Sequence, residues 1–168
     1  MKALITAGAI LAIAGAASAT DFTLPDSVLA GGESVSVGIT LDVEATGFSI
    51  GFDYDETVAD ASWASDVQFI ISDANGAVYT VGGFSNSGDA DALWSFDGSG
   101  SDGPGFYSDM FAVAIPAGDY TLTFVNDWST DPNPNIYNNI AGSFDKIPTP
   151  GAAGLLGLAG LAAVRRRR

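Results

Sequence analysis

The sequence between residues 20 and 146 predicts an all-β domain, an antiparallel β-sandwich. Two observations predict it. Apolar residues in this region do not recur at helical spacing, whereas apolar and polar residues alternate in several stretches, as they do in strands with one buried face. Between these stretches lie segments rich in Gly, Asp, Asn, Ser and Pro, which favour turns.

Alternation marks the individual strands. The alternating apolar positions are Val35, Val37, Ile39, Leu41 and Val43, then Phe48, Ile50, Phe52 and Tyr54, then Val67, Phe69 and Ile71, and finally Tyr120, Leu122 and Phe124. Asn75-Gly76 is a pair favoured in tight hairpins, where φ is positive, and it predicts a hairpin between the strand ending at Ser72 and residues 78–81. Residues 116–119 predict a second turn. About eight short strands then fit the region, the spacing expected of a sandwich or jelly roll.

Residues 1–19 have the three parts of a secretory signal peptide. Lys2 supplies the positive charge, an apolar run follows, and Ala17 and Ala19 are the small residues of the site that signal peptidase cuts. Cleavage after Ala19 leaves Thr20 as the first residue of the exported protein. The alternative is the hydrophobic helix of a cytosolic domain, which fits less well because the segment has no polar face.

Residues 147–168 are organised as a second signal. The residues with a defined role are Pro148 and Pro150 with Thr149 between them, and the terminal cluster Arg165, Arg166, Arg167 and Arg168. The apolar run between them, residues 151–164, would span about 21 Å as a helix, which is short of a hydrocarbon core of about 30 Å. A short span held by arginines on the cytoplasmic side predicts a transient stay in the inner membrane, followed by cleavage. An ordinary short membrane anchor is the alternative.

The order of a Pro-x-Pro motif, a short apolar segment and an arginine cluster resembles the PEP-CTERM class of C-terminal sorting signals. The resemblance covers residues 147–168. It implies that an exosortase, a membrane processing enzyme, cuts near the motif and passes the protein to the cell surface. The class usually has Glu between the prolines, where this chain has Thr149. The Leu-Pro-x-Thr-Gly signal of Gram-positive sortases fits less well, because Pro150 stands where that signal requires Thr.

Composition excludes several kinds of chemistry. The chain has neither Cys nor His, so thiolate and imidazole metal ligands and the Ser-His-Asp and Cys-His catalytic arrangements are absent. All 20 carboxylates lie between Asp21 and Asp145, a stretch without Lys or Arg, and the net charge is −14. Such a surface repels phosphate backbones, which excludes nucleic acid as a partner. A carboxylate pair of the glycosidase kind is the remaining route to catalysis, and we expect no enzyme.

Calcium is the one cofactor that the acidic residues suggest. Asp53 and Asp55 alternate with Phe52 and Tyr54, so both project from one outer face, where a divalent ion would relieve their repulsion. These two aspartates are the candidate metal ligands, and a solvated acidic surface is the alternative. Residues 131–135 imitate the start of an EF-hand loop, but the continuation lacks the Gly and Glu that the loop requires.

Parts of the region resemble the jelly-roll modules of secreted bacterial enzymes, the P domain and the prepeptidase C-terminal domain. The resembling segments are residues 63–67, 72–76 and 117–122. The resemblance implies a non-catalytic module of a kind that often binds calcium. Trp63, Trp94 and Trp128 lie beside strand ends and are predicted to be core or core-edge residues, with sugar stacking by one of them as the alternative.

The sequence therefore predicts three parts: a signal peptide with its helix (1–19), a β-sandwich ectodomain (20–146), and a sorting signal with a short hydrophobic helix (147–168). The predicted protein is exported to the cell surface or the extracellular matrix, where it has a structural or adhesive role. The alternative is a module that binds extracellular polysaccharide or another envelope polymer through its loops, and a secreted hydrolase is the weaker alternative.

Overall fold

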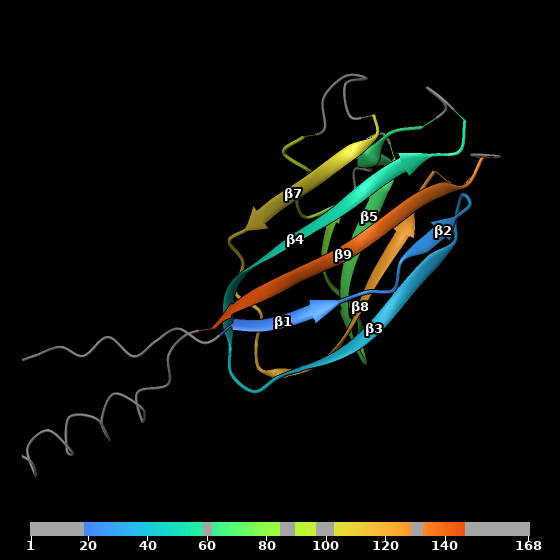
Figure 1. Cartoon of the computed structure of the whole chain (residues 1–168). Helices are drawn as coiled ribbons and strands as arrows, with labels where there is room; N and C mark the ends of the chain where they lie inside the picture. The colour runs from blue at the N-terminus through green and yellow to red at the C-terminus, as the bar shows by residue number, and fades with distance from the viewer. Residues whose placement is uncertain (1–18, 59–61, 85–89, 97–102, 129–132, 147–168) are drawn as a thin grey trace, which may run out of the picture. The chain divides into compact units, whose positions relative to one another are not determined.

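The computed structural model describes residues 19–58, 62–84, 90–96, 103–128 and 133–146. Within these residues the fold is all-β, and its strands form two antiparallel sheets that face each other, which confirms the predicted β-sandwich (Figure 1). The predicted signal peptide, apart from Ala19, and the predicted sorting signal lie outside the described residues. In the part of the chain that is described, no helix has the length and apolar character to cross a membrane.

The two sheets divide nine strands between them within the described residues. The first sheet has the order β1 (Ala19–Thr23), β9 (Asn135–Lys146), β4 (Ala45–Glu56) and β7 (Gly105–Phe111), and β2 (Ser27–Leu29) also pairs with β9. The second sheet has the order β3 (Ser34–Leu41), β8 (Gly118–Asn126), β5 (Val67–Asp73) and β6 (Gly76–Gly82). One 3₁₀ turn, η1 (Ala64–Asp66), precedes β5.

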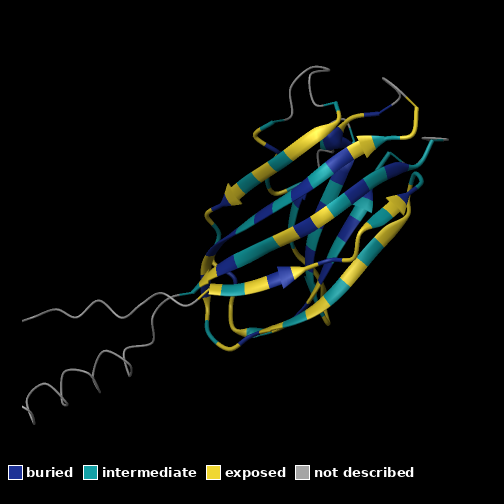
Figure 2. Ribbon diagram, in the orientation of Figure 1, coloured by how far each residue is buried: buried dark blue, intermediate teal, exposed yellow. Residues whose placement is uncertain are grey.

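The core lies between the sheets and is mainly aromatic. The alternation predicted for β4, β5 and β8 is confirmed, because the apolar members of all three strands are buried (Figure 2). Phe52 lies at the centre, with its ring centroid 5.0 Å from that of Phe124 on the opposite sheet and 5.9 Å from that of Tyr137 on β9. Such pairs bury large ring areas in tilted geometries, which stabilises the contact between the sheets.

Two local predictions need correction. The strand predicted to reach Val43 ends at Leu41, because the chain there turns from the second sheet to begin β4 in the first. The Asn75-Gly76 hairpin is present, but only Gly76 has a positive φ, of 134°. Asp73 shapes this turn instead, because its Oδ1 accepts a hydrogen bond from the Asn75 backbone N–H at 2.7 Å.

Asn139 forms a bulge in β9 that joins three segments of the first sheet. Its φ is 52°, and the β4–β9 register shifts at this level, between Gly51 and Asp53. The Asn139 backbone N–H donates to Asp26 Oδ1 at 2.7 Å, and its side-chain Nδ2 donates to Asp53 Oδ2 at 2.6 Å. The bulge therefore fixes the β1–β2 connection and the outer face of β4 to the same residue.

Both ends of the described domain lie on neighbouring strands. β1 begins at Ala19 and β9 ends at Lys146, and Ala19 pairs with Asp145. Figure 1 shows the two strand ends side by side at one end of the sandwich. The connections after β4, β6 and β8 lie at the opposite end, because these strands run toward η1 and the start of β5.

Phe22 anchors β1 to the core, and Gly142 makes room for it. Phe22 stacks on Phe69 with ring centroids 5.8 Å apart and lies 5.5 Å from the Phe144 ring. A Cβ added at Gly142 would lie 2.5 Å from Phe22 Cζ and 2.0 Å from the Ser49 backbone oxygen. Only glycine fits this position without displacing β1 or β4.

We predict that Gly142→Ala destabilises the domain by about 1–3 kcal/mol, the usual cost of overpacking a core. Gly38→Ala is the matched control, since Gly38 is also a strand glycine but an added Cβ there meets nothing nearer than Tyr120 O at 4.0 Å. The control should be neutral or gain about 0.5 kcal/mol from the lower backbone entropy of alanine. Urea denaturation measures both values. Equal stabilities for the two variants would contradict the close packing of Phe22 against Gly142.

Candidate functional site

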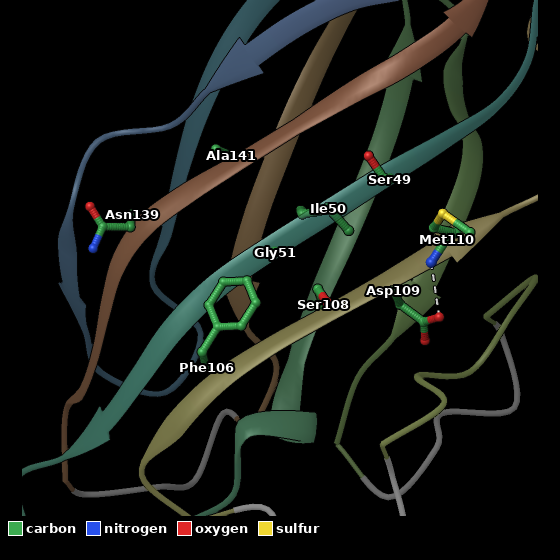
Figure 3. A pocket seen from close by; sticks show the side chains of 9 residues that line it. All are labelled: Ser49, Ile50, Gly51, Phe106, Ser108, Asp109, Met110, Asn139 and Ala141. Carbon is green, nitrogen blue, oxygen red and sulfur yellow. Dashed lines mark hydrogen bonds between the residues drawn. The ribbon is translucent and has the colours of Figure 1, made fainter.

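A shallow hollow of about 670 Å³ lies on the outer face of the first sheet. Figure 3 shows its lining, which β4, β7 and β9 contribute. The residues that line it are Ser49, Ile50, Gly51, Phe106, Ser108, Asp109, Met110, Asn139 and Ala141. Small side chains form its floor. A Cβ added at Gly51 would lie 3.0 Å from Phe106 Cζ, so a larger residue would not fit at this position.

Two exposed apolar side chains of the edge strand β7 border the hollow. Phe106 is 66% exposed and Met110 is 79% exposed, and both project from the outer face of β7. Asp109 is the acidic residue of the lining, and its carboxylate accepts hydrogen bonds from the backbone N–H groups of Ser95 at 2.6 Å and Met110 at 2.9 Å. The hollow therefore has an apolar border, and Asp109 is the one carboxylate residue in its lining.

Asp53 and Asp55, the predicted metal ligands, both lie on the outer face of β4. Asp53 accepts a hydrogen bond from Asn139 Nδ2, and Asp55 Oδ1 accepts one from the Glu56 backbone N–H at 2.9 Å. Among the described residues no group of three acidic side chains is placed to hold a metal ion. The EF-hand-like sequence is also extended from Asn135 onward, because β9 begins there. Calcium binding by Asp53 and Asp55 stays a prediction.

Backbone amides, which the sequence interpretation did not consider, satisfy many of the carboxylates. Besides Asp55, seven described carboxylates accept a hydrogen bond from a main-chain N–H at 2.6–3.0 Å. The pairs are Asp26 with Asn139, Glu33 with Ala30, Asp66 with Trp63, Asp73 with Asn75, Asp91 with Thr80, Asp109 with Ser95, and Asp127 with Phe84. We had expected these acids either to face water or to collect metal ions. Hydrogen bonds from main-chain N–H groups are a third way to satisfy a carboxylate, in addition to water and a metal ion.

Three aromatic rings form a stack at the end of the sandwich opposite Ala19 and Lys146. Trp128 is the middle ring: its centroid lies 5.1 Å from that of Phe84 with 7° between the planes, and 6.1 Å from that of Trp63 with 17° between the planes. Trp128 follows β8, Phe84 follows β6, and Trp63 precedes η1. We call Trp63, Trp128 and Phe84 the aromatic stack.

The three tryptophans differ in exposure. Trp94 is 2% exposed, and its Nε1–H donates to Val67 O at 2.8 Å, so the core assignment is right for this residue. Trp128 is partly buried, whereas Trp63 is 36% exposed. Trp63 therefore lies at the surface, and the sequence could not distinguish it from Trp94 because both were predicted to lie beside strand ends.

The chain matches no known protein-family model, and no curated protein sequence matches it.

We predict that acid destabilises the hairpin between β5 and β6. The backbone N–H of Asn75, with the Asn75 side chain, holds the pKa of the Asp73 carboxyl below its ordinary value. Because the folded pKa is the lower one, ionised Asp73 stabilises the fold above the unfolded pKa of about 4. This contribution to stability is lost as the pH falls through the pKa that Asp73 has in the folded protein. Asp73→Asn cannot titrate, so its stability should fall less steeply than that of the wild type below about pH 5.

Asp21→Asn is the control for the lost charge, since Asp21 is an exposed residue of β1 outside the turns. Thermal unfolding between pH 7 and pH 2 measures all three proteins. The same pH slope for Asp73→Asn and wild type would show that the Asp73 turn contributes nothing.

Proposed function

We propose that this protein is an exported, C-terminally sorted component of the cell surface or extracellular matrix, with a structural or adhesive role and no catalysis. The observation that carries the proposal is the position of the two chain ends. The signal peptide joins β1 and the sorting signal joins β9, and these strands are paired neighbours. Both predicted signals are thus joined to the same end of the sandwich, through two paired strands.

Removal of both signals would leave the folded domain intact. Cleavage after Ala19 removes one residue of β1 and leaves Thr20 paired with Phe144, with Phe22 still anchored in the core. Cleavage near Pro148 lies beyond Lys146, the last residue of β9. A protein that matures by two proteolytic steps needs such ends, because each cut must spare the hydrogen bonds of the sheet.

Strand order supports the jelly-roll resemblance. In a jelly roll, strands that are consecutive along the chain are distributed over two four-stranded sheets through Greek-key connections. The order β1-β9-β4-β7 opposite β3-β8-β5-β6 follows this pattern when the short β2 is set aside. The modules that this part of the chain resembles are appended to secreted enzymes and are non-catalytic, in agreement with a structural or adhesive role.

The aromatic stack favours a second candidate function, a module that binds an envelope polymer. A large ring that is 36% exposed, at the end of the sandwich opposite the last residue of β9, is a contact surface that the structural role alone does not require.

We predict that the mature surface protein begins at Thr20 and lacks Arg165–Arg168. The apolar run of residues 151–164 is too short to be a durable anchor, and the prolines around Thr149 present an extended backbone to a protease. Mass spectrometry of terminal peptides from the surface fraction of the native host measures both ends. Intact Arg168 in that fraction would refute processing and leave a plain membrane anchor.

A variant truncated after Ile147 is the control for folding. It keeps all of β9, including the Lys146 ammonium group that pairs with Asp42. It should therefore unfold at the same temperature as the processed wild type but be absent from the cell surface. A truncated protein that still reaches the surface would show that residues 148–168 are not the sorting signal.

A further inference from the structure

The aromatic stack is built on a rigid frame of backbone hydrogen bonds. Asp66 Oδ2 accepts from the Trp63 N–H at 2.9 Å, and the Asp66 N–H donates to Trp63 O at 3.1 Å. The Asp127 N–H donates to Asp66 O at 3.0 Å, and Asp127 Oδ2 accepts from the Phe84 N–H at 3.0 Å. One chain of hydrogen bonds thus connects the three loops that carry the rings.

A buried polar cluster fixes the residue next to Trp63. Ser62 is 1% exposed, and its hydroxyl donates to Asn135 Oδ1 at 2.5 Å and lies 3.1 Å from Tyr54 Oη. Ser62 is thereby tied to β9 and β4, the two central strands of the first sheet. The position of Trp63 is set on folding, so a ligand that contacts its ring need not order the loop.

The exposed ring is flat and its surroundings are acidic. Trp128 stacks on Trp63 with 17° between the planes, and Trp63 is 36% exposed. A planar indole suits the C–H face of a pyranose ring. The carboxylates of Asp66 and Asp127 belong to the same frame, whereas Lys146, the one basic side chain among the described residues, lies at the opposite end of the sandwich. Charge therefore selects against uronate, sulfate and phosphate groups, and an aromatic face attracts a cation.

We propose that the aromatic stack binds a sugar ring of a neutral or amine-bearing polysaccharide, with Trp63 as the contact ring. This inference rests on the proposed role at the cell surface or in the matrix, and it names the polymer to which the protein adheres. A parallel stack offers a flat face rather than the grooves between rings in which a proline-rich peptide lies. The geometry therefore favours a polysaccharide over a peptide.

Retention on polysaccharides tests the proposal. The protein expressed from its complete gene in its host, and purified from whichever fraction holds it, is incubated with cellulose as a neutral polymer, chitosan as an amine-bearing one and alginate as an anionic one. We expect retention on cellulose, on chitosan or on both, and none on alginate. Trp63→Ala should weaken retention by about tenfold or more, the effect of losing one stacking contact. Trp63→Phe, which keeps a flat ring, should restore part of it.

Phe106→Ala is the matched control, since Phe106 is also an exposed aromatic residue but lies on the sheet face. It should bind like the wild type, and equal melting temperatures for all variants exclude misfolding as the cause. Equal retention of Trp63→Ala and wild type would overturn the proposal. So would a protein that binds chitosan alone, if salt abolishes this binding equally in the wild type and in Trp63→Ala. Binding to a polyproline peptide without any polysaccharide would also overturn it. None of these outcomes depends on the state of Arg168, which tests processing separately.

Discussion

The structure depends on one electrostatic constraint: its carboxylates must be satisfied almost without cations. Lys146 is the only basic residue between positions 20 and 146, and it pairs with Asp42 at the surface. A buried carboxylate without a partner is very costly, so the remaining acids need other donors. The main chain supplies them at turns, at loop ends and along the edge strand β7. Asp66, which is 4% exposed, shows that such a donor can satisfy even a buried acid, since the Trp63 N–H bonds to it.

This solution also fixes the geometry of individual turns. Loops rich in glycine and serine have little intrinsic preference for one conformation, and a carboxylate that accepts two main-chain hydrogen bonds fixes the turn around it. Asp73 does so in the β5–β6 hairpin, and Asp109 does so where the segment at Ser95 meets β7. The acidic composition is thus a structural device in addition to a source of surface charge.

Packing of large rings imposes a second requirement, which glycine meets. Gly82 has a φ of 68°, and a Cβ added to it would lie 1.9 Å from Trp94 Nε1. Trp94 can therefore enter the core only beside a residue without a side chain, as Phe22 does beside Gly142. In each case the aromatic residue and its glycine are far from adjacent in sequence. Composition shows that both kinds of residue are abundant, but only the fold shows which of them meet.

The sequence predicted the strands β3, β4, β5, β6 and β8 and missed β9 and β7, for physical reasons. β4, β5 and β8 alternate regularly because one face of each is buried. In β9 the bulge at Asn139 separates the buried Tyr137 and Ile140 by three positions, which breaks the period of two. β7 has apolar side chains on both faces, so its sequence shows no alternation of apolar and polar residues. The aromatic stack joins three distant loops, and no local pattern could reveal it.

The antiparallel pairing of β4 with β9 has a mechanical consequence. Trp63 follows the C-terminal end of β4, and the predicted sorting signal follows the C-terminal end of β9. Because the two strands are antiparallel neighbours, these ends lie at opposite ends of the sandwich. A pull between a tethered tail and the aromatic stack therefore slides the two strands along each other. All the hydrogen bonds between them then share the load and must break together, so the fold resists tension best along this line.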